Sequence, residues 1–213
     1  KAAALLDAIV AKGGKNTAAA QNQKAYVDRL YAASGAADCG QMDQMYASVV
    51  AESANDIEKL GSIMKLYRRL GCTESDVYFA AAEHAHKLQP TSESAAGCAQ
   101  MCLKKEDYAG ALEYYKQALS MVTNDEDKAD YLYRMANVYV AMKNYQQGAA
   151  HAQQALDINA EDGRCYLLLG ICYASAKIYD DPILQRSVFW VACDMFRKAK
   201  SVDSSCTTDA NKL

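Results

Sequence analysis

An internal repeat constrains this chain more than any other feature of its sequence. Segments 105–119 and 143–156 place an aromatic residue, a small residue three positions later and an alanine seven positions further on in the same register, 37 residues apart. Segment 189–199 has the same spacing. Such a period predicts stacked copies of one unit that cannot bury its apolar face alone. The matched residues are Tyr108, Ala111 and Ala118; Tyr145, Gly148 and Ala155; and Phe189, Ala192 and Ala199.

Each repeated segment is preceded by an apolar stretch that contains a small residue, followed three positions later by another apolar residue. The chain has only 2 prolines, and proline is the residue that most strongly disrupts helices. It is also poor in valine and isoleucine, which a large β-sheet would need. These observations predict an all-α chain built from helix pairs. The paired positions are Ala99 and Cys102, Ala136 and Tyr139, and Gly170 and Tyr173.

This pattern resembles the tetratricopeptide repeat (TPR), a helix–turn–helix unit of about 34 residues. The resemblance implies a right-handed α-solenoid, in which small residues let helices cross closely and aromatic residues fill the turns. The proline that usually closes a TPR occurs only as Pro90, and its downstream places are held by Thr123, Ala160 and Ser204. The third copy carries extra residues around Tyr179–Ile183, which we expect to lengthen its inter-helix loop.

The repeat register divides the chain into N-terminal helices over residues 1–52, a degenerate repeat or cap, and TPR-like repeats over residues 53–213. We expect the repeats at 53–91, 92–124, 129–162 and 163–205, followed by the start of a truncated C-terminal helix. Because the chain starts with lysine and stops inside an expected helix, we expect it to be part of a longer protein.

Local signals add detail to this division. Residues 16–33 and 41–51 are expected to be helices, mainly by propensity. Thr123–Glu126 has the spacing of a capping box at a helix start, and Thr73–Asp76 offers a weaker cap.

In the TPR family the first helices of the pairs line a concave groove that takes an extended peptide or a partner helix. Ala96, Leu103 and Asp130 share the groove register. The alternative is that the apolar groove residues pack against a neighbouring element, such as a C-terminal capping helix. The resemblance places seven candidate partner-binding residues in the groove: Gln100, Tyr133, Asn137, Val140, Arg164, Leu167 and Ile171.

These residues differ in the contacts they would make. Tyr133 and Ile171 would act as apolar anchors, while Asn137 and Arg164 would hydrogen-bond a backbone or a carboxylate. One TPR subclass clamps the acidic C-terminal tails of chaperones with lysines and arginines. The matching positions here hold Ala96 and Tyr133 in place of lysine, so the sequence does not predict such a clamp.

A narrower resemblance concerns three segments, 38–43, 70–78 and 201–213. They are similar to stretches of exported TPR-containing proteins from Bacteroides-type bacteria. This similarity implies a periplasmic or otherwise exported protein, with a cytoplasmic location as the alternative.

The chain has 8 cysteines. We expect Cys39 and Cys72, each beside a glycine in a loop between helices, to form a disulfide, on this placement and the exported-family resemblance. In a cytosolic protein both would be reduced. Cys206 lies in the final linker. The remaining cysteines lie on repeat helices and are expected to act as small apolar residues: Cys98, Cys102, Cys165, Cys172 and Cys193.

No motif predicts catalysis, a metal or a cofactor. His84, His86 and His151 lie among polar residues, and no second pair of ligands accompanies Cys98 and Cys102 at a spacing that zinc needs. A pI near 5.6 with scattered basic residues argues against a nucleic-acid partner. Uncharged runs are too short for a membrane span, which needs about 20 residues.

The sequence therefore predicts a non-enzymatic scaffold that binds a protein or peptide partner in the groove of its repeats. The alternative is a structural spacer in a larger exported or envelope protein, with the groove filled by the protein's own chain. A third possibility, an enzyme whose active site lies outside this chain, has no residue here to support it.

Overall fold

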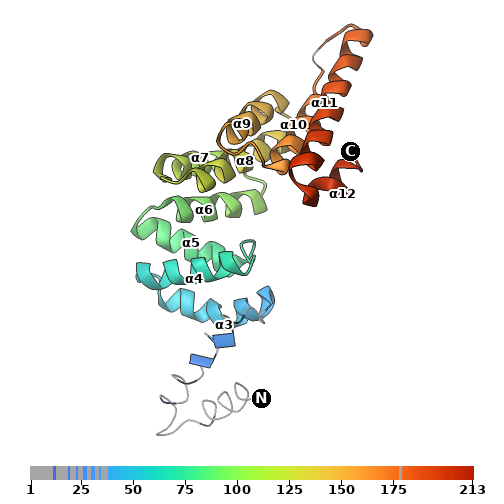
Figure 1. Ribbon diagram of the computed structural model, residues 1–213. Helices are drawn as coiled ribbons and strands as arrows, with labels where there is room; N and C mark the ends of the chain where they lie inside the picture. The colour runs from blue at the N-terminus through green and yellow to red at the C-terminus, as the bar shows by residue number, and fades with distance from the viewer. Residues whose placement is uncertain are drawn as a thin grey trace. The chain divides into compact units, whose positions relative to one another are not determined.

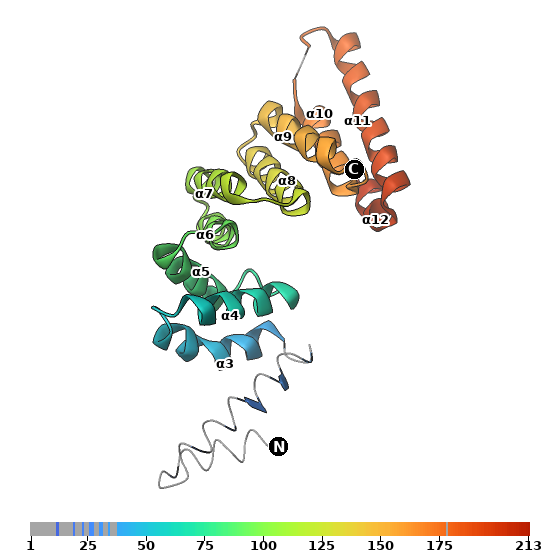
Figure 2. The same ribbon diagram turned by 60° about the vertical axis from the view of Figure 1, so that its left-hand side comes forward.

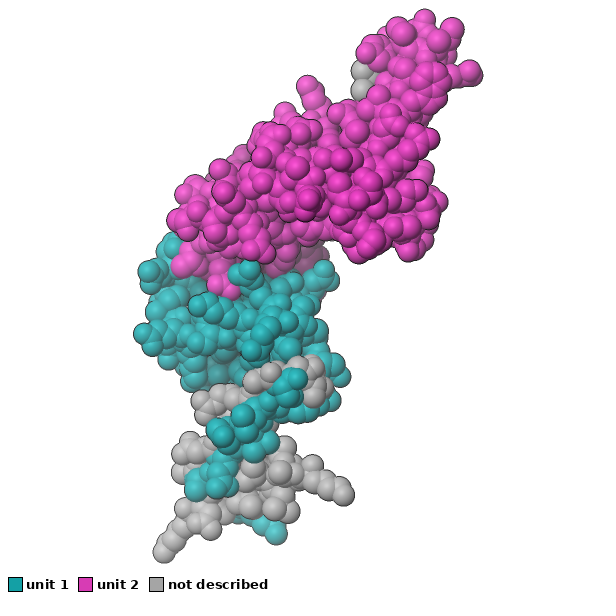
Figure 3. Space-filling view, in the orientation of Figure 1, with its two compact units in different colours: residues 1–90 teal, residues 91–213 magenta. Residues whose placement is uncertain are grey.

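The computed structural model describes residues 38–177 and 179–213, and the single residues 12, 19, 23, 26, 27, 30, 31 and 34. In this part of the chain the regular secondary structure is helical throughout. The chain packs as two compact units, Lys1–Pro90 and Thr91–Leu213, coloured separately in Figure 3. Of the helix expected over residues 16–33, the structure describes only residues 19, 23, 26, 27, 30 and 31, all of them helical, and the rest lies outside the described residues. The repeat boundaries expected from the sequence stay a prediction.

In its described residues, unit 1 consists of helices packed around an aromatic core. Tyr67 is fully buried, and its ring packs edge-on against Tyr46 and stacks with Tyr78, with ring centroids 6.1 and 6.3 Å apart. The helix expected over residues 41–51 is confirmed, and it packs against the last helix of the unit. The helices are α3 (Cys39–Glu52), α4 (Ile57–Arg69) and α5 (Asp76–Leu88).

Unit 2 is a succession of helix pairs (Figures 1 and 2). The two helices of each pair contact each other, and consecutive pairs pack through α7 on α8 and α9 on α10. The helix pairs predicted from the repeat are therefore confirmed. They are α6 (Ser92–Lys104) with α7 (Tyr108–Met121), α8 (Asp125–Ala141) with α9 (Tyr145–Ile158), and α10 (Gly163–Ser175) with α11 (Pro182–Val202), followed by the short helices η1 (Ser204–Cys206) and α12 (Thr207–Ala210).

The first two pairs of unit 2 make the same turn between their helices. Each turn holds a residue other than glycine in the left-handed region, Glu106 with φ 58° and Lys143 with φ 60°. The next residue, Asp107 or Asn144, accepts a hydrogen bond from a backbone N–H in the first turn of the following helix. The sequence repeat is therefore also a repeat of backbone conformation.

Small residues occupy the helix crossings, as the repeat predicts. Ala99 and Ala136 are fully buried. A Cβ atom on Gly170 would lie 2.2 Å from Cε1 of the Phe196 ring and 2.8 Å from Cζ. Helices α10 and α11 can approach this closely because residue 170 has no side chain.

Two helix starts lie later than predicted. The capping box expected at Thr123 is wrong, because Asn124 caps α8 and its Oδ1 accepts a hydrogen bond from the Asp127 N–H at 2.7 Å. The cap expected at Thr73 is wrong in the same way, since the hydroxyl of Ser75 caps α5. Each stretch contains two neighbouring residues that can cap a helix, and their spacing in the sequence does not show which of the two does so.

The third pair has the longer inter-helix loop predicted around residues 179–183, with six residues between Ser175 and Pro182 compared with three in each of the first two pairs. Helix α11 has 21 residues, compared with 14 in α7 and in α9, and it begins at Pro182 with Asp181 as its N-cap. The extra residues therefore lengthen the helix more than the loop. Proline suits the first position of a helix because the N–H that it lacks has no helical partner there.

Candidate partner-binding face

The seven residues predicted to bind a partner lie on the first helices of the pairs in unit 2. Three lie on α8, three on α10 and one on α6. Along α8 and α10 they follow one another at spacings of three or four residues, which places them on one side of each helix. We call this surface of α6, α8 and α10 the A-helix face. Its predicted residues are Tyr133, Asn137 and Val140; Arg164, Leu167 and Ile171; and Gln100.

The apolar residues of the A-helix face also contact the core. Tyr133 and Val140 pack against the buried cluster that joins α8, α9 and α10, and both are half-buried. Leu167 and Ile171 are half-buried as well. These four apolar side chains are therefore partly packed against other residues and partly exposed on the A-helix face.

The C-terminal helices contribute to the packing of α10. Leu167 and Ile171 pack against a cluster that contains Phe196 of α11 and Ala210 of α12. Part of each of these two side chains is therefore covered by C-terminal helices, as the alternative interpretation of the apolar groove residues expects.

Arg164 is held by two carboxylates and an aromatic ring. Its Nε and Nη2 atoms donate to Asp162 at 3.0 and 2.7 Å, and its Nη1 atom lies 3.6 Å from Asp130 Oδ1. Its guanidinium carbon lies 4.5 Å from the centroid of the Tyr133 ring, a cation–π contact between α10 and α8. These contacts hold in place a side chain that is 48% exposed.

The ion pair with Asp162 changes the pKa values of both groups. Hydrogen bonds to Asp162 raise the pKa of Arg164 above its ordinary value. Burial alone would raise the pKa of Asp162, but the hydrogen bonds and charge of Arg164 outweigh burial and lower it. Asp162 also caps α10, since its Oδ1 accepts a hydrogen bond from the Arg164 N–H at 3.0 Å. The pair therefore fixes both the start of α10 and the charge on the A-helix face.

Asp130 connects this pair to α8. Its Oδ2 accepts a hydrogen bond from Arg134 Nε at 2.6 Å, one turn further along the helix. Burial would lower the pKa of Arg134, but the neighbouring carboxylate of Asp130 raises it. The two carboxylates balance the two guanidinium groups, and the donors of Arg164 are largely used within the chain. This part of the face is therefore close to neutral.

Asn137 presents an acceptor on the same face. Its Nδ2 donates to the backbone oxygen of Tyr133 at 3.0 Å, one turn earlier in α8. Across residues 38–177 and 179–213, no group donates to Asn137 Oδ1. This oxygen is therefore able to accept a hydrogen bond from the N–H of an extended peptide.

A pocket of about 400 Å³ lies between α9 and α10, outside the A-helix face. None of the seven predicted residues lines it. Tyr145 and Tyr173 stand at packing positions of the repeat in the sequence, and no motif marks a pocket there. The lining residues are Tyr145, Gln146, Ala149, Cys172, Tyr173, Ala176 and Lys177.

The free cysteines on α6 and α10 are buried, as expected for packing residues. Burial raises the pKa of Cys172 to about 11 and that of Cys165 to about 12. Both thiols are therefore protonated near neutral pH, where the thiolate is the reactive form. The same expectation is wrong for Cys193, which lies exposed on α11.

Nowhere in the described part of the chain do three or more His, Cys, Asp or Glu side chains come together in a group that could hold a metal ion. No described helix is both long and apolar enough to cross a membrane.

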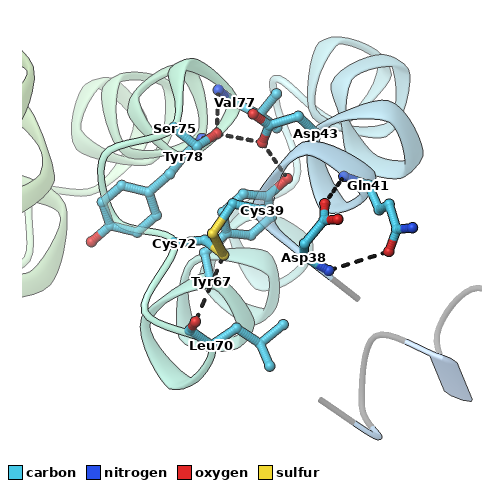
Figure 4. Close-up of a disulfide and its surroundings, with 10 residues drawn as sticks. All are labelled: Asp38, Cys39, Gln41, Asp43, Tyr67, Leu70, Cys72, Ser75, Val77 and Tyr78. Atoms are coloured by element: carbon cyan, nitrogen blue, oxygen red, sulfur yellow. Dashed lines mark hydrogen bonds between the residues drawn. A yellow bond between two sulfur atoms is a disulfide. The ribbon is translucent and has the colours of Figure 1, made fainter. Parts of the chain in front are cut away.

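The structure contains the predicted disulfide between Cys39 and Cys72 (Figure 4). The two residues are 33 positions apart in sequence, and their Cα atoms lie 5.4 Å from each other. The expectation that both lie in loops is wrong for Cys39, which is the first residue of α3 and follows its N-cap, Asp38. Cys72 lies in the turn between α4 and α5, beside Gly71, whose φ is 72°. The bond therefore ties the start of α3 to that turn.

Asp43 joins the same helices through hydrogen bonds (Figure 4). Its Oδ1 accepts from the hydroxyl of Tyr67 on α4, at 3.1 Å, and from the hydroxyl of Ser75, the N-cap of α5. Burial and the charge of Asp43 raise the pKa of Tyr67. The disulfide and this carboxylate together fix α3 on α4 and α5.

The helix pairs, the turn shared by the first two pairs of unit 2 and the small residues at the helix crossings define an α-solenoid of TPR-like repeats. The predicted fold class, an all-α right-handed α-solenoid, is confirmed. The crystal structure of MamA has a similar fold: its TM-score is 0.58, and the match covers 79% of this chain and 92% of MamA at 17% sequence identity.

Sequence comparison gives partial matches. No protein-family model matches the chain. Protein unc-45 homolog B of Xenopus laevis is 36% identical over 75 residues, and Photosystem I assembly protein Ycf3 of Synechococcus sp. (strain CC9902) is 33% identical over 67 residues. These matches cover 35% and 32% of this chain, and 8% and 39% of the two relatives. The chain therefore spans much less than the full length of either protein.

Proposed function

We propose that this chain is a non-enzymatic scaffold that binds a peptide or an extended segment of a partner protein on the A-helix face. The observation that carries the proposal is the pairing of Arg164 with Tyr133, held by Asp130 and Asp162. Side chains that are ordered before binding lose little entropy when a partner arrives, which favours affinity. One relative, Ycf3, is named as an assembly protein for photosystem I, a role that agrees with protein binding.

The chemistry of the face indicates the kind of segment it would take. Asn137 Oδ1 would accept a hydrogen bond from a backbone N–H, and the exposed parts of Tyr133 and Val140 would contact an apolar side chain. A carboxylate would have to compete with Asp130 and Asp162 for Arg164. We therefore expect an uncharged, partly apolar segment in preference to an acidic tail.

Selection of peptides from a random phage-display library on the immobilised chain tests this proposal. The dissociation constants of the enriched peptides are then measured by fluorescence polarisation. Tyr133→Ala combined with Asn137→Ala should weaken binding at least about tenfold, because the variant lacks an aromatic anchor and a backbone acceptor. Its helix content, measured by circular dichroism, should match that of the wild type.

A matched control removes similar side chains from another surface. Tyr145→Ala combined with Gln146→Ala alters the pocket between α9 and α10 and should leave the affinity for the selected peptides unchanged. If the A-helix variant binds as tightly as the wild type, or if only the control loses binding, the proposed surface is wrong.

A spacer that fills its own A-helix face is the second candidate. It is favoured by one observation: Ala210 of α12 belongs to the cluster against which Leu167 and Ile171 pack. Removal of residues 204–213 would expose part of α10. If this truncation increases the affinity for selected peptides at least about tenfold, occupation of the face by the chain's own C-terminal segment is favoured. An unchanged affinity argues against it.

We also propose that the protein is exported, with a periplasmic location as the specific form. The disulfide supports this, because such bonds persist in oxidising compartments, and so does the resemblance to exported Bacteroides-type proteins. Alkylation of thiols in intact cells, followed by mass spectrometry, tests the proposal. Protection of Cys39 and Cys72 is expected, whereas their complete alkylation would favour the cytoplasmic alternative.

A further inference from the structure

Helix α11 extends past the end of α10 (Figures 1 and 2), and the first half of the helix carries large exposed apolar side chains. Trp190, the only tryptophan of the chain, is 72% exposed, and Ile183 is 77% exposed. Leu184, Phe189 and Val191 on the same helix are also exposed. Tryptophan is among the residues that contribute most often to binding energy in protein interfaces.

Trp190 lies on the opposite side of α11 from the residues that hold the helix in place. Val188, Ala192 and Ala199 are buried. At about 100° per residue, Trp190 points away from them, and five other residues lie within about 40° of it, of which Ser201 is near the end of the helix. We call this surface the outward face. It consists of Ile183, Arg186, Trp190, Asp194, Arg197 and Ser201.

The charges of the outward face are arranged symmetrically about its tryptophan. Arg186 lies four residues before Trp190, and Asp194 lies four residues after it. In the described part of the chain Arg186 has no ion-pair partner. Asp194 pairs with Arg197 at 2.7 Å on the exposed surface of the helix.

We propose that a second copy of this chain docks on the outward face, with the two α11 helices antiparallel and crossing at Trp190. A two-fold axis at this point brings Arg186 of each copy to Asp194 of the other, and it brings the two tryptophan rings together. A symmetric contact of this kind uses one surface twice. The parallel arrangement would place Arg186 against Arg186, a pairing of like charges.

The projecting part of α11 is held in place before any such contact. Gln185 Nε2 donates to the backbone oxygen of Ala176 at 3.0 Å, and Gln185 Oε1 accepts from the Tyr179 N–H at 3.0 Å. These two bonds tie the preceding loop to the first turns of the helix. The outward face is therefore pre-organised, which reduces the entropy lost on association.

Sedimentation equilibrium of the whole chain over micromolar to submillimolar concentrations tests the proposal. The wild-type mass should rise with concentration towards twice the chain mass of 23.2 kDa. Trp190→Ala should raise the dimer dissociation constant at least about tenfold. Lys116→Asp, an exposed charge reversal on α7, should leave it unchanged. A wild-type chain that stays monomeric throughout this range would overturn the proposal.

A charge swap tests the symmetry. Arg186→Asp and Asp194→Arg should each weaken the dimer, because each places like charges together. The double variant should restore the wild-type dissociation constant, because the exchanged charges meet again across the two-fold axis. A double variant that associates no better than the weaker single variant would contradict the antiparallel arrangement.

A disulfide tests the orientation directly. In Ser187→Cys, the new thiol faces Cys193 of the other copy if the helices are antiparallel. Within one chain these positions are separated by about 9 Å of helical rise, more than the roughly 7 Å that a disulfide spans. Peptide mapping of the oxidised dimer should show bonds between positions 187 and 193. Bonds that join only 187 to 187 or 193 to 193 would indicate parallel pairing and overturn the proposal.

Discussion

Replacement of Gly170 by alanine should destabilise unit 2, although alanine forms helices better than glycine does. Gly170 lies inside α10, where the added Cβ would approach three ring carbons of Phe196 at 2.2 to 2.8 Å. Real side chains do not tolerate such distances, so the ring or α11 must move. The ring has little room to do so, since Phe196 is itself buried.

The size of the effect follows from two opposing terms. Overpacking of a core costs about 1–3 kcal/mol, and a contact as short as that at Phe196 belongs at the upper end of this range. The better helix propensity of alanine offsets about 1 kcal/mol. We therefore expect a net loss of about 2 kcal/mol for Gly170→Ala.

Native-state hydrogen exchange read by mass spectrometry measures the free energy of opening of each helix separately. Gly61→Ala is a matched control, because Gly61 lies inside α4 and an added Cβ there meets no atom within 4 Å. The control should raise the opening free energy of α4 by about 1 kcal/mol. If Gly170→Ala stabilises α10 by a similar amount, close approach of α10 and α11 is not the reason for a glycine at this position.

Three further predictions concern the disulfide, the turn after α8 and the ion pair on the A-helix face. Replacement of Cys39 and Cys72 by serine should lower the stability of unit 1 by about 3–4 kcal/mol, the entropy of closing a loop of this length; equal urea denaturation curves for the oxidised and reduced wild type would contradict this. Lys143→Gly should raise the free energy of unfolding by about 0.5–1 kcal/mol, because glycine adopts a positive φ without a steric penalty; a loss of stability in the same assay would argue against strain at this turn. Asp162→Asn should destabilise α10 at neutral pH. The pKa of Asp162 is lower in the folded than in the unfolded chain. The ionised carboxylate therefore adds to the free energy of unfolding above the unfolded pKa of about 3.9, and this stabilisation is lost as the pH falls through the folded pKa. A loss that is independent of pH in thermal denaturation would show that the charge of Asp162 does not matter.

The repeat predicted the fold because its most regular positions are those that packing restricts most. Ala136 and Gly170 mark places where two helix backbones approach closely, so only small residues fit and the pattern is visible in one sequence. The turns at Glu106 and Lys143 were within reach of the same alignment, but their left-handed conformation was not, since both residues are unusual choices there.

The extra length of α11 was not predicted because the effect of a proline such as Pro182 depends on its position in a helix. A proline interrupts a helix in its interior but favours a helix start at the first position, and Asp181 before it is a good cap. With residues 179–183 expected in a loop, the first turn of α11, which carries Ile183 of the outward face, was not expected to be helical.

The sequence predicted which residues form the candidate site, but it did not predict which of their side chains contact one another. The TPR register placed Tyr133 and Arg164 in the groove, yet it contains no information about which side chains meet there. The pairing of Arg164 with Asp162 and Asp130 depends on how α8 packs beside α10, and Asp162 stood in the sequence only as a residue between helices. The pocket lined by Tyr145 and Tyr173 was missed for the same reason, because its walls come from two helices.

The central claim, that a partner segment binds on the A-helix face, is tested most directly by nuclear magnetic resonance. An isotope-labelled chain is titrated with a peptide from the display selection, and the shifted signals are assigned to residues. We expect the largest shifts to fall on Tyr133, Asn137 and Arg164. Shifts concentrated instead on Tyr145 and Tyr173, around the pocket between α9 and α10, with the A-helix face unchanged, would contradict this claim.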